Sequence, residues 1–231
     1  MDKTRTPLSK WFMAMFLLSG DKRGASALAI SKSIGVAYFT AWSMCQKIRH
    51  AMGTRDATHK MDGIVEMDET FFGSADEGGK RGRGAEKTAA MVSVSLTADG
   101  KPRFARMKVV GAVNGASALS FAESTVAKGS EIRTDGLNVY PVLGRNGYNL
   151  VQKKYSPEKQ SKHLHWTHIV ISNAKAFIEG TFHGLDGIHL QRYLDEFCYR
   201  FNRRWLTGGV FSQLVLACAL SGKITYHELI G

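Results

Sequence analysis

The chain has 231 residues, of which 44% are hydrophobic, and it carries a formal net charge of +11. This length allows one large folded domain or two smaller ones, and the positive charge is typical of proteins that bind a polyanion such as nucleic acid. The three cysteines (Cys45, Cys198 and Cys218) lie far apart, which argues against a disulfide framework or a cysteine zinc site. No stretch has the roughly 18 uninterrupted apolar residues of a membrane span, so we expect a cytoplasmic protein.

Residues 1–55 predict helices. Between residues 26 and 52, two apolar series at helical spacing are separated by Gly35, which marks a turn. This pattern is the outline of a helix-turn-helix, the second helix of which enters a DNA groove in many DNA-binding proteins. That helix would present polar side chains, among them Lys47 and Arg49, to DNA or to solvent. An ordinary helical hairpin with a solvated basic face fits these residues equally well.

From Gly63 the apolar residues alternate, which is typical of strands. We expect strands over 64–72, 89–97 and 102–111, the last two joined by a hairpin turn, then a helix over 116–127 and a short strand over 131–134. Helices are predicted over 169–178, 188–204 and 209–220. Three strands, a helix and a further strand indicate a mixed α/β sheet flanked by helices.

Two aspartates are expected on adjacent strands, one within a strand and one directly after a strand. Strand alternation places Glu66, Asp68 and Thr70 on one face, and Asp135 follows the strand over 131–134 directly, before a glycine. Either aspartate alone is more often a turn or cap residue. Together, on one sheet of a basic chain, they predict a site for hard divalent cations, because carboxylate oxygens suit Mg²⁺. Two such ions about 4 Å apart would activate the attacking hydroxyl and stabilise the leaving oxygen of a phosphodiester.

A glycine-rich basic loop follows the first of these strands. Glycines let main-chain N–H groups approach phosphate closely, so this loop is a candidate contact for a nucleic-acid backbone. Its cationic residues are Lys80, Arg81, Arg83 and Lys87.

Several motifs resemble bacterial insertion-sequence transposases of the ISXO-like group. "VEMDETFFG", "GKRGRGAEKT", "RTDGLNVYPVL" and "GTFHGLDGIHLQRYLDEFCYRFNRR" follow the order of that group's blocks over nearly the whole chain. The resemblance implies an RNase H-like catalytic domain of the DDE type over 60–231, preceded by a helix-turn-helix region over 1–55. Its first two catalytic, metal-binding aspartates fall on Asp68 and Asp135. The zinc ribbon that usually precedes the helix-turn-helix has no counterpart in this sequence.

The resemblance also implies partners, cofactors and a location. A transposase of this kind uses two Mg²⁺ or Mn²⁺ ions to cleave double-stranded transposon ends and join them to target DNA, acting as a homo-oligomer at the bacterial nucleoid. Two alternatives remain open. One is a catalytically impaired remnant that only binds DNA, and the other is an RNase H-like nuclease.

The third catalytic position departs from the commonest pattern of the group. Its members carry a Glu on a helix, with a Lys seven residues later, before a Gly-Thr-aromatic-His block, which is residues 180–183 here. Counting back aligns Lys175 with the Lys, a candidate phosphate contact, and His168 with the Glu. A branch of the group uses Asn, and Asn173 is nearby. Since Asn173 lies about 140° around a helix from His168, the two do not face one site, and both stay candidates.

Overall fold

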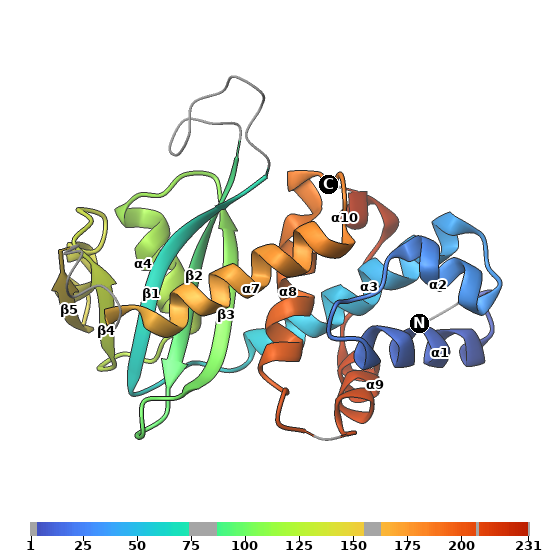
Figure 1. The fold of residues 1–231 in the computed structure, drawn as a ribbon, viewed down its shortest axis with the longest axis horizontal. Coiled ribbons are helices and arrows are strands. Elements are labelled where there is room, and N and C mark those ends of the chain that lie inside the picture. The colour runs from blue at the N-terminus through green and yellow to red at the C-terminus, as the bar shows by residue number, and fades with distance from the viewer. Residues whose placement is uncertain (1–3, 74–86, 155–162, 207, 231) are drawn as a thin grey trace. The chain divides into compact units, whose positions relative to one another are not determined.

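The structure is a computed structural model, and it describes residues 4–73, 87–154, 163–206 and 208–230 (Figure 1). The chain forms two compact units, one made of Met1–Thr58 and Ala176–Gly231 and the other of His59–Lys175. The first boundary lies close to the expected one. Residues 176–231, however, group with the N-terminal helices instead of with the sheet, unlike the expected division into 1–55 and 60–231.

The first unit is helical. Its N-terminal part contains α1 (Leu8–Gly20), α2 (Ala27–Ile34) and α3 (Tyr38–Ala57). Ser26 caps α2 by accepting a hydrogen bond from the Ala29 N–H, and Gly35 ends it in the left-handed conformation, with φ of 63°. The helix-turn-helix order expected over 26–52 is therefore present. The C-terminal part contains η1 (Gly187–His189), α8 (Leu190–Phe201), α9 (Val210–Leu220) and α10 (Tyr226–Ile230). No residues of α10 were predicted as a helix.

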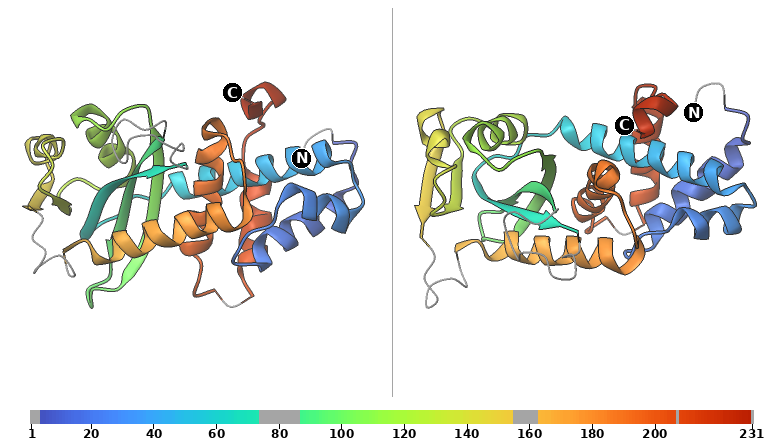
Figure 2. Two further views of the ribbon diagram at one scale, coloured as in Figure 1. Left: turned by 45° about the horizontal axis from the view of Figure 1, so that its top comes forward. Right: turned by 90° about the horizontal axis from the view of Figure 1, so that it is seen from above.

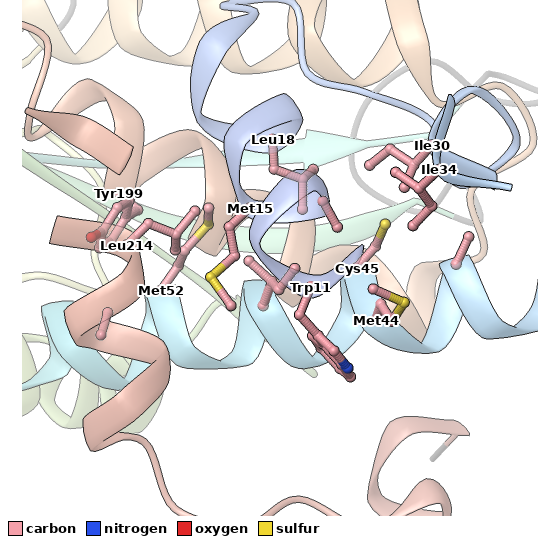
Figure 3. Packing of buried hydrophobic residues seen from close by; sticks show 14 residues of the cluster. Trp11, Met15, Leu18, Ile30, Ile34, Met44, Cys45, Met52, Tyr199 and Leu214 are labelled. Carbon is pink, nitrogen blue, oxygen red and sulfur yellow. The ribbon is translucent and has the colours of Figure 1, made fainter. Parts of the chain in front are cut away.

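One apolar core explains why the C-terminal helices join this unit. Figure 3 shows Trp11, Met15 and Leu18 of α1 packed with side chains of α2 and α3 against Tyr199 of α8 and Leu214 of α9. All of these side chains are buried. The three N-terminal helices alone would leave this apolar face in water, and α8 and α9 cover it.

The second unit is built on a five-stranded mixed sheet with the strand order β3-β2-β1-β4-β5. Its strands are β1 (Ile64–Phe72), β2 (Thr88–Leu96), β3 (Pro102–Val110), β4 (Glu131–Asp135) and β5 (Asn149–Lys153). β2 is antiparallel to both β1 and β3, whereas β4 is parallel to both β1 and β5. The first four strands were predicted. β5 and the short helix α5 (Pro141–Arg145) were not.

Helices cover both faces of this sheet. α4 (Gly115–Thr125) lies on one face and the first turns of α7 (His165–Thr181) lie on the other (Figure 2). Successive side chains of β1 point to opposite faces of the sheet. Val65 and Met67 face α4, because they share a core with its residue Phe121. Glu66, which points the opposite way, meets α7. Among the described residues, no helix is long and apolar enough to cross a membrane.

Candidate active site

The sheet register brings the two predicted aspartates together. β1 and β4 pair in parallel up to Glu66 and Arg133. Extending that register by two residues sets Asp68 level with Asp135, the last residue of β4. The next residue, Gly136, passes close to Lys154: a Cβ atom at this position would be 3.0 Å from the Cα atom of Lys154, so a residue without a Cβ atom is needed here.

A third carboxylate completes the cluster. Asp68, Glu69 and Asp135 are half-buried, and each contributes a carboxylate oxygen to a group in which all such atoms lie within 4.8 Å of one another. Two unit charges at that distance repel by about 3 kcal/mol at an effective dielectric constant of about 20. A divalent cation relieves such repulsion, and three carboxylate oxygens are the donors that Mg²⁺ and Mn²⁺ prefer. The residues present therefore fit the metal that the resemblance implies.

Glu69 reaches this cluster from the other face of β1. Its Oε2 atom accepts a hydrogen bond of 2.8 Å from the hydroxyl of Tyr140, a residue with no exposed surface. Burial, followed by the charges of Glu69, Asp68 and Asp135, raises the pKa of Tyr140 well above its usual value, so the phenol stays a neutral donor. The sequence did not predict a metal-binding role for Glu69 or a contact with Tyr140, although both residues lie within the motifs quoted above.

Two contacts fix the start of α7 against the sheet. The buried carboxylate of Glu66 accepts hydrogen bonds from the backbone N–H of Thr167, at 2.8 Å, and from its hydroxyl, at 3.1 Å. Nε2 of His163 lies 2.8 Å from the carbonyl oxygen of Thr134, next to Asp135. Glu66 is thus an anchor for α7, which holds the helix beside the acidic cluster.

This anchoring places His168 at the cluster. Its Nε2 atom lies 3.3 Å from Oδ2 of Asp68. The hydrogen bond to Asp68 raises the pKa of His168, helped by the charges of Asp68, Glu66 and Asp135, while partial burial opposes the rise. His168 is therefore a direct neighbour of the first aspartate.

The other two candidates on α7 differ in position. Lys175 is half-buried and lies seven residues after His168, on the same side of the helix. Asn173 is exposed, and the structure shows no side-chain hydrogen bond between it and any described residue. Geometry in this structure thus favours His168 over Asn173 as the neighbour of the aspartates.

Among the predicted DNA contacts, Lys80, Arg81 and Arg83 lie outside the described residues. Lys87 is half-buried just before β2, and Lys47 lines a cleft with Trp11 and His50.

The prediction that Arg49 faces DNA is wrong. Its side chain has no exposed surface, and its Nε atom donates to Oε2 of Glu196 at 2.7 Å. The guanidinium also lies 4.0 Å from the centre of the Tyr193 ring. Helical spacing assigned Arg49 to a polar face, but α8 covers that face.

Three solved structures are similar to this chain. The intasome of simian T-cell lymphotropic virus, in complex with PP2A regulatory subunit B56 gamma, matches at 11% identity and a TM-score of 0.36, covering 80% of this chain and 64% of that chain. The chain therefore spans less than two thirds of that relative. The Mos1 transposase paired-end complex with the left transposon end matches at 12% identity and 0.29, covering 93% and 82%. The Mos1 mariner paired-end complex with Mn matches at 10% and 0.28, covering 96% and 82%.

The sequence itself gives a more direct assignment. No curated protein matches it. The family model described as the ISXO2-like transposase domain matches residues 60–202, more than half of the chain. This range includes the whole mixed sheet, both aspartates and all of α7, and the mixed α/β sheet flanked by helices that was expected above is present. The chain thus belongs to the ISXO2-like transposase domain family.

Proposed function

We propose that this chain is the transposase of an insertion sequence, which cleaves the 3′ ends of its element and joins them to target DNA by metal-dependent phosphoryl transfer. The observation that carries the proposal is the meeting of Asp68 and Asp135 at the level where β4 ends, within the range that the transposase family model matches. The net charge of +11 supports double-stranded DNA as the substrate.

Each residue of the site has a distinct role in this proposal. Asp68 and Asp135 would hold two divalent cations, which when bound would activate the attacking hydroxyl and stabilise the leaving oxygen. His168 orients Asp68 through their 3.3 Å contact. Lys175, on the same side of α7, and Lys87 would bind DNA phosphates as point charges. Acting on chromosomal DNA, the protein would work in the bacterial cytoplasm.

Joining two ends of one element calls for more than one subunit, so we also propose a homo-oligomer on DNA. Leu8, Phe12 and Phe16 of α1 support this proposal, because each exposes more than two fifths of its surface, an uncommon feature for large apolar side chains at helical spacing. Light scattering with and without DNA ends would measure the oligomer. A monomer under both conditions would contradict the proposal.

One observation favours a second candidate. His168 replaces the glutamate of the commonest family pattern, which suits a remnant that binds DNA without cutting it. Cleavage and joining of labelled DNA that carries the element's own ends distinguishes the candidates. The proposal expects activity in Mg²⁺ or Mn²⁺ that Asp68→Asn and Asp135→Asn abolish. A matched control is Asp62→Asn, because Asp62 is an exposed aspartate of the same unit.

Each failure has a distinct meaning. Salt-sensitive DNA binding without cleavage in either metal would support the remnant. Cleavage without joining would support an RNase H-like nuclease. Equal activity of the Asp68→Asn variant and the natural protein would rule out the proposed site.

A further inference from the structure

The carboxylate of Glu69 has a partner that fixes its position. We propose that Glu69, held by Tyr140, supplies the third carboxylate of the metal site, in place of the glutamate that most family members carry on α7. This inference rests on the proposed function. It assigns all three carboxylates to β1 and β4, and leaves His168 as the contribution of α7.

The first support is the geometry of β1. Asp68 and Glu69 are consecutive, so their side chains leave the strand on opposite faces. Both nevertheless bring an oxygen within 4.8 Å of the other and of Asp135. They do so because β1 has run past its last pair with β4, at Glu66 and Arg133. The side chains of Asp68 and Glu69 therefore both reach the level at which β4 ends.

The second support is the direction that Tyr140 imposes. Its ring is fully buried in the core between the sheet and α4, and its hydroxyl donates to Oε2 of Glu69 at 2.8 Å. A buried phenol has few rotamers, so the hydroxyl holds the carboxylate in one place. As a neutral donor it leaves the negative charge of Glu69 intact, whereas a lysine or arginine partner would cancel it.

The third support is a short loop that ties Tyr140 to Asp135. The backbone N–H of Leu137 donates to Oδ1 of Asp135 at 3.0 Å, and the N–H of Tyr140 donates to the carbonyl oxygen of Leu137 at 3.3 Å. Gln152 of β5 donates to the carbonyl oxygens of Asp135 and Leu137, both at 3.1 Å. The hydrogen-bonded loop from Asp135 to Tyr140 thus positions Asp135 directly and Glu69 through Tyr140.

The chemistry of His168 is the fourth support for a role of Glu69. An imidazole nitrogen is a softer ligand than a carboxylate oxygen, and His168 already contacts Asp68. A site with only Asp68 and Asp135 would offer two protein carboxylates. With Glu69 it offers three, the number that the commonest family pattern provides. Tyr140 is then a positioning residue, acting on the metal through Glu69.

Direct measurement of Mn²⁺ binding to the full chain without DNA, by electron paramagnetic resonance, tests the proposal. We expect Glu69→Gln to weaken Mn²⁺ binding by about tenfold or more, and Tyr140→Phe to weaken it several-fold by releasing Glu69. The matched controls are Glu123→Gln, an exposed carboxylate of the same unit, and Tyr148→Phe, another buried tyrosine of the same core. Both should change Mn²⁺ binding less than about twofold.

The variant Asp135→Asn separates two kinds of failure. If it loses Mn²⁺ binding while Glu69→Gln and Tyr140→Phe bind like the natural protein, the role of Glu69 is wrong and the proposed function survives. If the natural protein binds no Mn²⁺, both the metal-dependent function and this inference fail. Should Glu69→Gln not fold, as judged by circular dichroism, Tyr140→Phe decides, because it keeps the ring and removes only the hydroxyl.

Discussion

Nε2 of His168 lies 3.3 Å from Oδ2 of Asp68, where most members of the family carry a glutamate. Because an imidazole nitrogen favours Mn²⁺ over Mg²⁺ relative to a carboxylate, the natural chain should cleave DNA faster in Mn²⁺. We predict that His168→Glu shifts the ratio of cleavage rates toward Mg²⁺. Measuring initial rates in each metal gives this ratio, and an unchanged ratio would show that residue 168 does not meet the metal.

Asn173 is the natural control for that experiment. It is exposed and lies on a different side of α7 from His168, so Asn173→Ala should change the cleavage rate less than about twofold. A loss as large as that of Asp68→Asn would instead identify Asn173 as the third catalytic residue.

Glu66 anchors α7 through Thr167, and its removal should cost stability. Glu66→Ala leaves a buried N–H and hydroxyl of Thr167 without their acceptor, which costs about 1–3 kcal/mol. Glu66→Gln keeps an acceptor oxygen at the same position and should cost less. Urea unfolding of both variants measures the difference in free energy. Equal losses would mean that the hydrogen bonds to Thr167 do not hold the helix.

The parts of the fold that follow strong local patterns were predictable from sequence. β1 and β2 are largely buried, and their apolar residues gave boundaries within one or two residues of those observed. β5 was not recognised, because none of its five residues is buried and its letters, "NLVQK", carry no clear alternation. Such an edge strand exists because β4 offers a parallel partner, and single-sequence patterns do not record that partner.

The residues of the candidate site that follow local patterns were also predictable, and those that depend on distant segments were not. Asp68 and Asp135 were found because strand alternation and strand ends are local features. Glu69 was not found, because strand alternation places it on the face opposite Asp68. Its carboxylate reaches Asp68 and Asp135 only because β4 ends at this level. The position predicted for Arg49 was wrong for a related reason: its partner Glu196, in the helix α8 that buries it, comes 147 residues later in the chain.

Lys175 lies on the side of α7 that carries His168, which makes it a candidate contact for a phosphate near the cluster. We predict that Lys175→Ala weakens DNA binding and lowers the slope of log K against log salt concentration by about 1. Lys101→Ala is the control, because Lys101 is exposed at the β2–β3 turn and pairs with Asp99. Titrations at several salt concentrations measure the slope. Equal slopes for Lys175→Ala and Lys101→Ala would remove Lys175 from the DNA contacts.

The buried pair of Arg49 and Glu196 makes a stability prediction. Removing Arg49 takes away the closer of two guanidinium partners of the buried Glu196 carboxylate and leaves Arg200 at 3.3 Å, so Arg49→Ala should lower the free energy of unfolding by at most about 3–5 kcal/mol. The double variant Arg49→Met with Glu196→Leu should lose much less. Arg55→Ala, at an exposed position of the same helix, is the control. If Arg49→Ala instead leaves stability unchanged and weakens DNA binding, the observed burial does not hold in solution.

Cys45 gives the helical core a dependence on alkaline pH. Burial raises the pKa of its thiol from 9.0 to about 11. A folded-state pKa above the unfolded value means that the stabilisation is complete below about pH 9 and is lost as the pH rises toward 11. At pH 10.5 the loss from this thiol is about 2 kcal/mol. Cys45→Ala should therefore show a smaller decrease in the free energy of unfolding between pH 8 and 10.5 than the natural protein. An equal decrease would mean that the Cys45 thiol ionises as easily in the folded chain as in the unfolded one, which is incompatible with its place in the core beside Met44 and Ile48.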